Sequence, residues 1–425
     1  MTEFIFIFIF FLILLVIGAP ISISIGASAV LGCLWLGYPL VIIGQRMVSG
    51  IDSFLLIAIP LFILAGNLMN AGKITEKIFN FARELVGWIP GGLGHANVVA
   101  SVIFAGMSGS AAADAGGLGT IEMEAMTKNG YDKEFSGAIT AASSVIGPIF
   151  PPSIPLIIYG SIASVSVAQL FLGGVVPGLL MAAALMVLVF IMAIKRGYPR
   201  TPFSIRMLAK EFFASILSLI TPLIILSGFV LGWFTPTEAS SVAVAYALII
   251  SVVVYRTMNW NSFKECLLES ALTSANVLFI IGSSSLFSYL LIREGISARI
   301  AAFLLGISSN PLVILLAVNI LLLILGMFME PGAILTLILP ILIPIARGLN
   351  MDMVHFGLVI VLNLMIGQVT PPFGVCLFVV GDVGKIEMHR LYRSILPFLI
   401  PLIITLFLCT YIPQIVTWLP YALIK

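Results

Sequence analysis

The sequence predicts an all-α polytopic membrane protein built from two inverted repeats. Of its 425 residues, 61% are hydrophobic and only 9% are charged, and the mean hydropathy is +1.21. Soluble proteins carry about 25% charged residues, so this chain has too little polar surface to face water and requires lipid around it. Long apolar segments follow one another along the whole chain, and several landmark residues recur at one fixed interval.

Apolar segments of about 20 residues, the length that spans a bilayer, predict eight unbroken transmembrane helices. Two further crossings, 133–164 and 353–382, are interrupted by GPIFPP at 147–152 and GQVTPP at 367–372. Glycine and paired prolines cannot continue an ordinary helix, so we expect each of these crossings to divide into two half-helices around an unwound loop. The unbroken helices are expected at 4–18, 20–38, 53–71, 167–194, 210–232, 236–257, 270–292 and 390–420.

Two other apolar segments, 95–126 and 311–347, predict helical hairpins that enter the membrane and return to the same side. A small, polar centre from Gly106 to Ser110 divides the first segment into two arms. Arms of about 13–16 residues reach roughly 20–24 Å, less than a hydrocarbon core about 30 Å thick. The second segment follows the same plan, with its tip between Gly326 and Gly332. Shorter amphipathic segments at 75–88 and 296–307 are expected to lie in the membrane interface before each hairpin.

The two halves of the chain, 1–200 and 205–425, are related by an offset of 220 residues. Each half is expected to hold five crossings, one of them broken, and one hairpin. An odd number of crossings inverts the second half relative to the first, and inverted repeats with broken helices are typical of secondary transporters. The landmarks that coincide at this offset are Gly106-Met107 with Gly326-Met327, Gly137 with Gly357, Gly147 with Gly367, and Pro151-Pro152 with Pro371-Pro372.

The basic residues predict the orientation of the chain. This topology places 15 of the 20 lysines and arginines on one side of the membrane, which the positive-inside rule makes the cytoplasmic side. Both termini are then expected to be extracytoplasmic. The net charge of +2 offers no face for nucleic acid. The basic residues left on the outer side are Arg46, Arg293, Arg299, Arg347 and Lys425.

The two hairpin tips and the two unwound loops are expected to meet near the middle of the membrane. Unwound backbone exposes carbonyl oxygens, which suit a hard cation such as sodium, while the N-termini of half-helices offer amide donors to an anion. The first tip, from Ser108 to Ser110, would form one cage with 147–152. The second tip would form its counterpart with 367–372, where Thr370 adds a hydroxyl group. The alternative is that these small residues only allow close helix packing.

Charged residues near these elements have alternative interpretations. Asp114 and Glu330 are acids at membrane depth, where acids are usually functional, but either can also cap a helix. Arg46 would attract a carboxylate or would anchor the chain at the interface. Glu122 and Glu124 are expected to be solvated at the cytoplasmic end of their hairpin arm.

Five motifs, in this order along the chain, resemble the large membrane subunit (M) of tripartite ATP-independent periplasmic (TRAP) transporters. The likeness covers nearly the whole sequence. The motifs are GMSGSAAADA at 106–115, PPSIP at 151–155, TPTEA at 235–239, MEP at 329–331 and PPFG at 371–374.

The resemblance implies an elevator-type fold like that of ion transporters, and sodium-coupled uptake of an organic acid such as a C4-dicarboxylate, a keto acid or sialic acid. It also implies two partners, a small membrane subunit (Q) and a periplasmic substrate-binding protein (P). A stand-alone sodium/carboxylate symporter of related fold and a membrane-embedded enzyme are the alternatives. The family's sodium ligands lie around its hairpin tips and broken-helix loops, so the resemblance implies Na⁺ as the coupling ion at Ser108, Ser110, Gly147, Pro152, Gly326, Gly367 and Thr370. The substrate contacts that we expect are Asp114, Gly109, Glu330 and Arg46.

Overall fold

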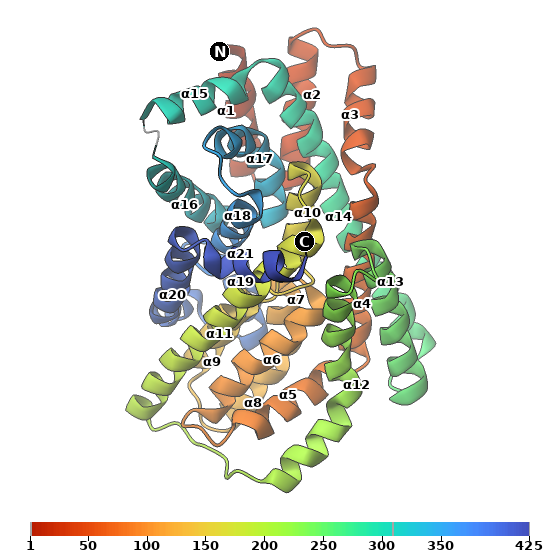
Figure 1. Cartoon of the computed structure of the whole chain (residues 1–425), viewed down its shortest axis with the longest axis vertical. Coiled ribbons are helices and arrows are strands. Elements are labelled where there is room, and N and C mark those ends of the chain that lie inside the picture. The colour runs from red at the N-terminus through yellow and green to blue at the C-terminus, as the bar shows by residue number, and fades with distance from the viewer. Residues whose placement is uncertain (1, 308–309, 425) are drawn as a thin grey trace.

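The computed structural model describes residues 2–307 and 310–424, and within these ranges the protein is built from helices without any strand (Figure 1). Lys425, counted above on the outer side, lies outside the described residues. The elements of the first half are α1 (Thr2–Val16), α2 (Ile21–Trp35), α3 (Val41–Ile51), η1 (Phe54–Ile57), α4 (Ala58–Ala71), α5 (Ile74–Val86), α6 (Gly92–Ser108), α7 (Ala111–Ala113), η2 (Asp114–Leu118), α8 (Gly119–Lys128), α9 (Lys133–Ser144), α10 (Ile154–Ala163) and α11 (Val167–Arg196).

The second half repeats the first element by element from its interfacial helix onward. The first residues of α6 and α16 are 219 positions apart, those of α7 and α17 and of α9 and α18 are 220 apart, and those of α11 and α20 are 221 apart. The elements of the second half are α12 (Ile205–Val230), α13 (Pro236–Ile249), η3 (Ile250–Val254), α14 (Trp260–Arg293), α15 (Ile296–Ile307), α16 (Pro311–Phe328), α17 (Pro331–Gly348), α18 (Met353–Gly367), α19 (Val375–Gly384), α20 (Met388–Tyr411) and α21 (Gln414–Leu423).

The two repeats are inverted. The interfacial helix α5 lies at the bottom of the molecule in Figure 1, and its counterpart α15 lies at the top. The first hairpin (α6 to α8) accordingly reaches the centre from below, and the second (α16 and α17) reaches it from above. Both predicted interruptions are confirmed, because α9 and α10 are separated by 145–153, and α18 and α19 by 368–374. Each of these loops contains a cis Pro-Pro peptide bond, at Pro151-Pro152 and Pro371-Pro372.

The landmark glycines of the broken helices allow each half to pack against the other. A Cβ atom at Gly357 of α18 would lie 2.2 Å from the ring of Tyr159 on α10. Its counterpart Gly137 on α9 faces α19 and the residues after it, with Ile386 Cδ1 only 2.6 Å from the Cβ position. The buried Tyr159 hydroxyl donates a 2.7 Å hydrogen bond to the carbonyl oxygen of Met353, which joins the two broken helices. The broken helices therefore form one central unit.

The hairpin arms are longer than the sequence predicted. In the described chain, eight helices are long and apolar enough to cross a membrane, and α16 and α17 are two of them. With 17 or 18 residues, each arm of α6, α16 and α17 measures about 26–27 Å, so length alone does not distinguish an arm from a crossing. The expected arm length was wrong for the first hairpin because α6 begins at Gly92, three residues before the predicted segment, and continues to Ser108 inside the expected tip.

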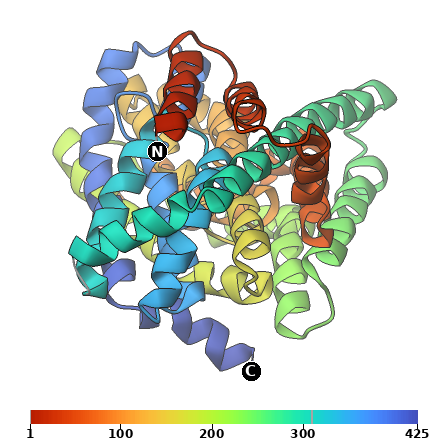
Figure 2. The same ribbon diagram turned by 90° about the horizontal axis from the view of Figure 1, so that it is seen from above.

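Three other helices differ from the prediction. The additional helix α3 precedes α4 and is separated from it at Asp52 and Ser53. Helix α14 begins ten residues earlier than expected and crosses the molecule as one long tilted helix, as Figure 2 shows from above. Its first turns carry Lys264, Glu265 and Glu269. These charged residues interrupt the apolar pattern from which the start of the helix was predicted. The predicted helix 390–420 ends at Tyr411, and α21 begins a new direction after Pro413.

Candidate ion and substrate site

The first hairpin tip lies directly against the first unwound loop. Helix α6 ends at Ser108, and Gly109 takes the left-handed conformation (φ +60°) that glycine adopts without steric cost. A Cβ atom at Gly109 would lie 2.6 Å from the carbonyl oxygen of Pro152, so only glycine fits this contact. Ser110 then caps the returning arm by accepting a 3.4 Å hydrogen bond from the backbone N–H of Ala113. The tip and the loop thus expose hydroxyl and carbonyl oxygens side by side.

The second tip packs on the second unwound loop in the same way. A Cβ atom at Gly367 would lie 2.7 Å from the backbone of Gly326. The N–H of Gly374 donates a 3.0 Å hydrogen bond to the carbonyl oxygen of Met327, which ties the loop to the tip. The Thr370 hydroxyl donates to the carbonyl oxygen of Ile366 at 2.7 Å, and its lone pairs stay free to accept. The pseudo-symmetry of the sequence therefore extends to these contacts.

One cavity of about 550 Å³ lies between the two tips. The first tip supplies Ser108, Gly109 and Ser110 to its wall, and the second tip supplies Glu330 and Pro331. Among the described residues that line it there is no lysine, arginine or histidine. The remaining lining residues come from α4, α7, α10, α14, α17, α18 and α19, with the loop residues Pro148 and Gln368.

Four helix N-termini open onto this cavity. Its lining includes the first residues of the returning first arm (Ala111), of α10 (Ile154), of α17 (Pro331) and of α19 (Val375). Helix N-termini carry unpaired N–H groups and the positive end of the helix dipole. The positive ends of four helix dipoles therefore meet in the wall of this cavity, which also contains the acid Glu330.

The predicted site residues divide into three groups. Ser108, Gly109, Ser110 and Glu330 line the cavity. A second group, Gly147, Pro152, Gly326, Gly367 and Thr370, lies in the loops or at the tip contact behind that wall.

The other two predicted residues, Asp114 and Arg46, are not among the cavity residues. Asp114 is 1% exposed below the first tip, and Arg46 is exposed, with its guanidinium carbon 4.2 Å from the centre of the Tyr289 ring. The stacking on Tyr289 matches the interfacial role that the sequence left open for Arg46.

Two polar residues of the cavity were missed in the sequence, Asn67 on α4 and Thr273 on α14. Asn67 also donates a 2.9 Å hydrogen bond to Ser270, which joins α4 to α14. A lone amide or hydroxyl group in an apolar helix is the only signal that these two residues give, and it does not tell a cavity residue from a packing residue. A third polar residue of the cavity, Gln368, lies in the predicted loop 367–372 but was not named as a site residue.

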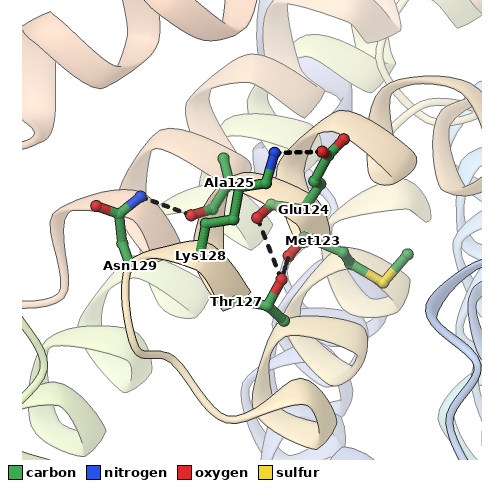
Figure 3. A network of polar contacts seen from close by, with 6 residues as sticks. All are labelled: Met123, Glu124, Ala125, Thr127, Lys128 and Asn129. Carbon is green, nitrogen blue, oxygen red and sulfur yellow. Dashed lines mark hydrogen bonds and ion pairs between the residues drawn. The ribbon is translucent and has the colours of Figure 1, made fainter.

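The expectation for Glu122 was wrong. Glu122 is fully buried, and its Oε2 atom accepts a 2.6 Å hydrogen bond from the Asn97 amide. Glu124, two residues later, is exposed as expected and forms a 2.5 Å ion pair with Lys128 (Figure 3). The side of α8 that carries Glu122 packs on α6 and α9, whereas the side that carries Glu124 faces outward. The sequence positions alone did not separate these two faces.

A catalytic pairing of Ser108 with His95 is excluded by distance. His95 and Ser108 lie at opposite ends of α6, about 20 Å apart along the helix axis. Among the described residues there is also no group of three histidine, cysteine or acidic side chains that would hold a metal. Fold and cavity thus define a multi-pass membrane protein of two inverted repeats with a central cavity between its hairpin tips.

Comparisons with known proteins give the family. A family model described as "Tripartite ATP-independent periplasmic transporter, DctM component" matches residues 8–415. The chain therefore belongs to the DctM family, the large permeases of TRAP transporters, and is a transport protein, not an enzyme.

Two curated relatives illustrate the range of the family. The chain is 48% identical to the sialic acid TRAP transporter large permease protein SiaM of Vibrio cholerae, over 88% of each chain. It is 33% identical to the 2,3-diketo-L-gulonate TRAP transporter large permease protein YiaN of Escherichia coli, over 94% of each. The substrates in these names differ, so the family does not by itself assign one.

A solved structure shares the fold. The crystal structure of the Alcanivorax borkumensis YdaH transporter covers 99% of this chain with a TM-score of 0.65, and the chain covers 98% of that structure. The two sequences are only 13% identical, so this likeness concerns the fold alone.

Proposed function

We propose that this chain drives the sodium-coupled uptake of an organic acid across the bacterial inner membrane. The observation that carries the proposal is the cavity between the two hairpin tips, onto which four helix N-termini open. Such a cavity binds a carboxylate through backbone N–H groups. Because none of the described lining residues is basic and Glu330 is itself an acid, co-bound cations are needed to offset the negative charge of the loaded cavity.

The oxygen atoms around each tip suit sodium as this cation. The Ser108 hydroxyl is buried and has no hydrogen-bond partner, and it lies at the contact where Gly109 meets the Pro152 carbonyl oxygen. Ser108, Ser110, Gly147 and Pro152 would hold one sodium ion. A second ion would be held by Gly326, Gly367 and Thr370. Hydroxyl and carbonyl oxygens are ligands that hard cations prefer.

Gly109 and Glu330 are the predicted substrate contacts that we retain. We add Asn67, Thr273 and Gln368, whose amide and hydroxyl groups supply donors and acceptors for the polar part of the acid. We propose a sialic acid as the substrate, on the 48% and 47% identity to permeases named for it in Vibrio cholerae and Haemophilus influenzae.

Movement of the hairpins and broken helices past α4 and α14 would expose the cavity to each side in turn, as an elevator mechanism requires. Asn67 and Thr273 line the cavity from these two helices, and all its other lining residues outside α4 and α14 belong to the hairpins or broken helices. The excess of basic residues on the α5 side supports a cytoplasmic location of that side, with both termini in the periplasm. The proposed partners are a small membrane subunit, which enlarges the fixed part, and a periplasmic binding protein, which delivers the acid.

The test is uptake into proteoliposomes that contain this chain and a small subunit, with an added binding protein loaded with radiolabelled sialic acid. We expect uptake with an inward sodium gradient and none when choline replaces sodium. Uptake that ignores the sodium gradient would refute the coupling. Uptake of a loaded C4-dicarboxylate, but not of sialic acid, would refute the substrate and leave the coupling intact.

A further inference from the structure

A pair of buried acids lies below the first hairpin tip, outside the cavity. Asp114 is 1% exposed and Glu122 is fully buried, and their carboxyl groups interact electrostatically. Asp114 follows the tip closely, since its N–H donates a 3.1 Å hydrogen bond to the carbonyl oxygen of Ser110. Glu122 lies two turns further along the same arm. The pair thus occupies the path between the tip and the outer end of the first hairpin.

The π-helical turn η2 aligns the two acids. In a regular α-helix, residues eight positions apart point about 80° away from each other. The wider turn at Asp114–Leu118 rotates less per residue and brings Asp114 towards the face of Glu122. Such π turns often occur at functional sites. Both acids therefore face α6, which the same arm packs against.

Four oxygen atoms in this place lack a donor. Neither carboxylate oxygen of Asp114, nor Glu122 Oε1, nor the hydroxyl of the buried Ser101 has a hydrogen-bond partner. Ser101 of α6 lies beside Asp114, in a geometry that falls short of a hydrogen bond. Among the described residues, no lysine, arginine or histidine forms an ion pair with either acid. Buried, uncompensated carboxylates are costly, so either a cation or protons have to neutralise them.

Packing does not require these acids, because the second repeat builds the same element without them. At the offset of 220 residues, Asp114 corresponds to Ile334 and Glu122 to Leu342. Both of these residues are 1% exposed in α17. The fold therefore accepts hydrocarbon at these two positions, and the acids of the first repeat mark a function of that repeat alone.

The surrounding network is built to hold Glu122 in place. The Asn97 amide donates to Glu122 Oε2 at 2.6 Å and to the Thr140 hydroxyl at 2.8 Å. The side-chain amide oxygen Oδ1 of Asn97 accepts a 2.7 Å hydrogen bond from the Ser143 hydroxyl. Helices α6 and α9 thereby fix one oxygen of Glu122 and leave the other free towards Asp114. The Glu122 carboxylate is therefore preorganised to bind a cation through its free oxygen.

We propose that Asp114, Glu122 and Ser101 form a further sodium site, separate from the tip cages and one helical turn or more away from the first of them. A hard cation takes oxygen ligands, and four are free. Ca²⁺ takes six to eight oxygens and Mg²⁺ keeps several waters, which is more than this closed site supplies. The site would provide a second binding position for sodium, between the first tip and the outer end of the first hairpin. As a step in coupling it rests on the proposed function, but as a binding site it does not.

The test is equilibrium binding of ²²Na⁺ to the purified full-length chain. The double variant Asp114→Asn/Glu122→Gln keeps the shape of both side chains and removes their charge. We expect it to bind one sodium ion fewer per chain than the wild type, or to bind that ion about tenfold or more weakly. Glu124→Gln is the matched control, since this exposed acid lies on the same helix and pairs with Lys128. We expect the control to bind as the wild type does.

Two further measurements keep the outcome decisive. If the double variant fails to fold, Glu122→Gln and Ser101→Ala separately report on the same ion, since the amide oxygen introduced by Glu122→Gln still accepts from Asn97. A double variant that binds as many sodium ions as the wild type, with the same affinity, overturns the proposal. So does one in which only the pH dependence of stability changes, because the acids then take up protons instead. Loss of this ion in a chain without sodium-driven uptake would leave the site standing and refute only the coupling.

Discussion

The contact between Gly326 and Gly367 makes a sharp prediction about the second half of the protein. In the variant Gly367→Ala, the new Cβ atom would lie 2.7 Å from the Cα and carbonyl carbon atoms of Gly326 and 3.2 Å from its oxygen. These are backbone atoms of α16, so no side chain can rotate away and the helices α16 and α18 have to separate. Overpacking of this kind costs typically about 1–3 kcal/mol of stability.

The pseudo-symmetric position and an open glycine provide the controls. At Gly147, a Cβ atom would lie 3.2 Å from the Ser144 carbonyl oxygen and no closer to any other atom outside its neighbours, so Gly147→Ala is expected to cost less. Gly44 in α3 has nothing within 4 Å, so Gly44→Ala is expected to be neutral or to add about 0.5–1 kcal/mol. Thermal unfolding of the purified variants in one detergent ranks them. Equal midpoints for Gly367→Ala and Gly44→Ala would refute the close packing of tip and loop.

Three further predictions concern single side chains. Ser108→Ala removes a hydroxyl group that is buried without a hydrogen-bond partner. We expect the thermal unfolding midpoint in choline to stay at the wild-type value, and the increase of that midpoint on adding sodium to become smaller. Arg46→Gln should leave the KM of uptake at the wild-type value, because the guanidinium stacks on Tyr289 outside the cavity; a large increase in KM would place it at the substrate. Asn319→Ala removes hydrogen bonds of 2.9 Å from Asn363 and 3.0 Å to Thr410, so unfolding should become easier by about 1–3 kcal/mol, whereas no loss would show these buried groups to be satisfied otherwise.

Much of the architecture follows from the sequence because it depends on local properties. Apolar length sets where helices cross, and glycine with paired prolines sets where the helix at 147–152 and 367–372 has to stop. The 220-residue offset needs no knowledge of contacts, and it correctly predicts the order of hairpin and broken helix in both halves. The start of α14 was predicted ten residues too late, because the charged residues at 264–269 do not fit the apolar pattern by which a membrane helix is predicted.

The site depended on the tertiary structure. Glu122 and Glu124 are chemically alike and two residues apart, yet packing against α6 and α9 buries the first while the second pairs with Lys128 at the surface. Asn67 and Thr273 belong to helices far apart in sequence and meet in one cavity only when α4 packs on α14. The sequence by itself determined the helices, their breaks and their repeat, since these follow from backbone chemistry and local apolarity. Which polar side chains face the cavity, and which acids are buried below it, was decided by the rotation of each helix about its axis, because that rotation is set by contacts between distant segments.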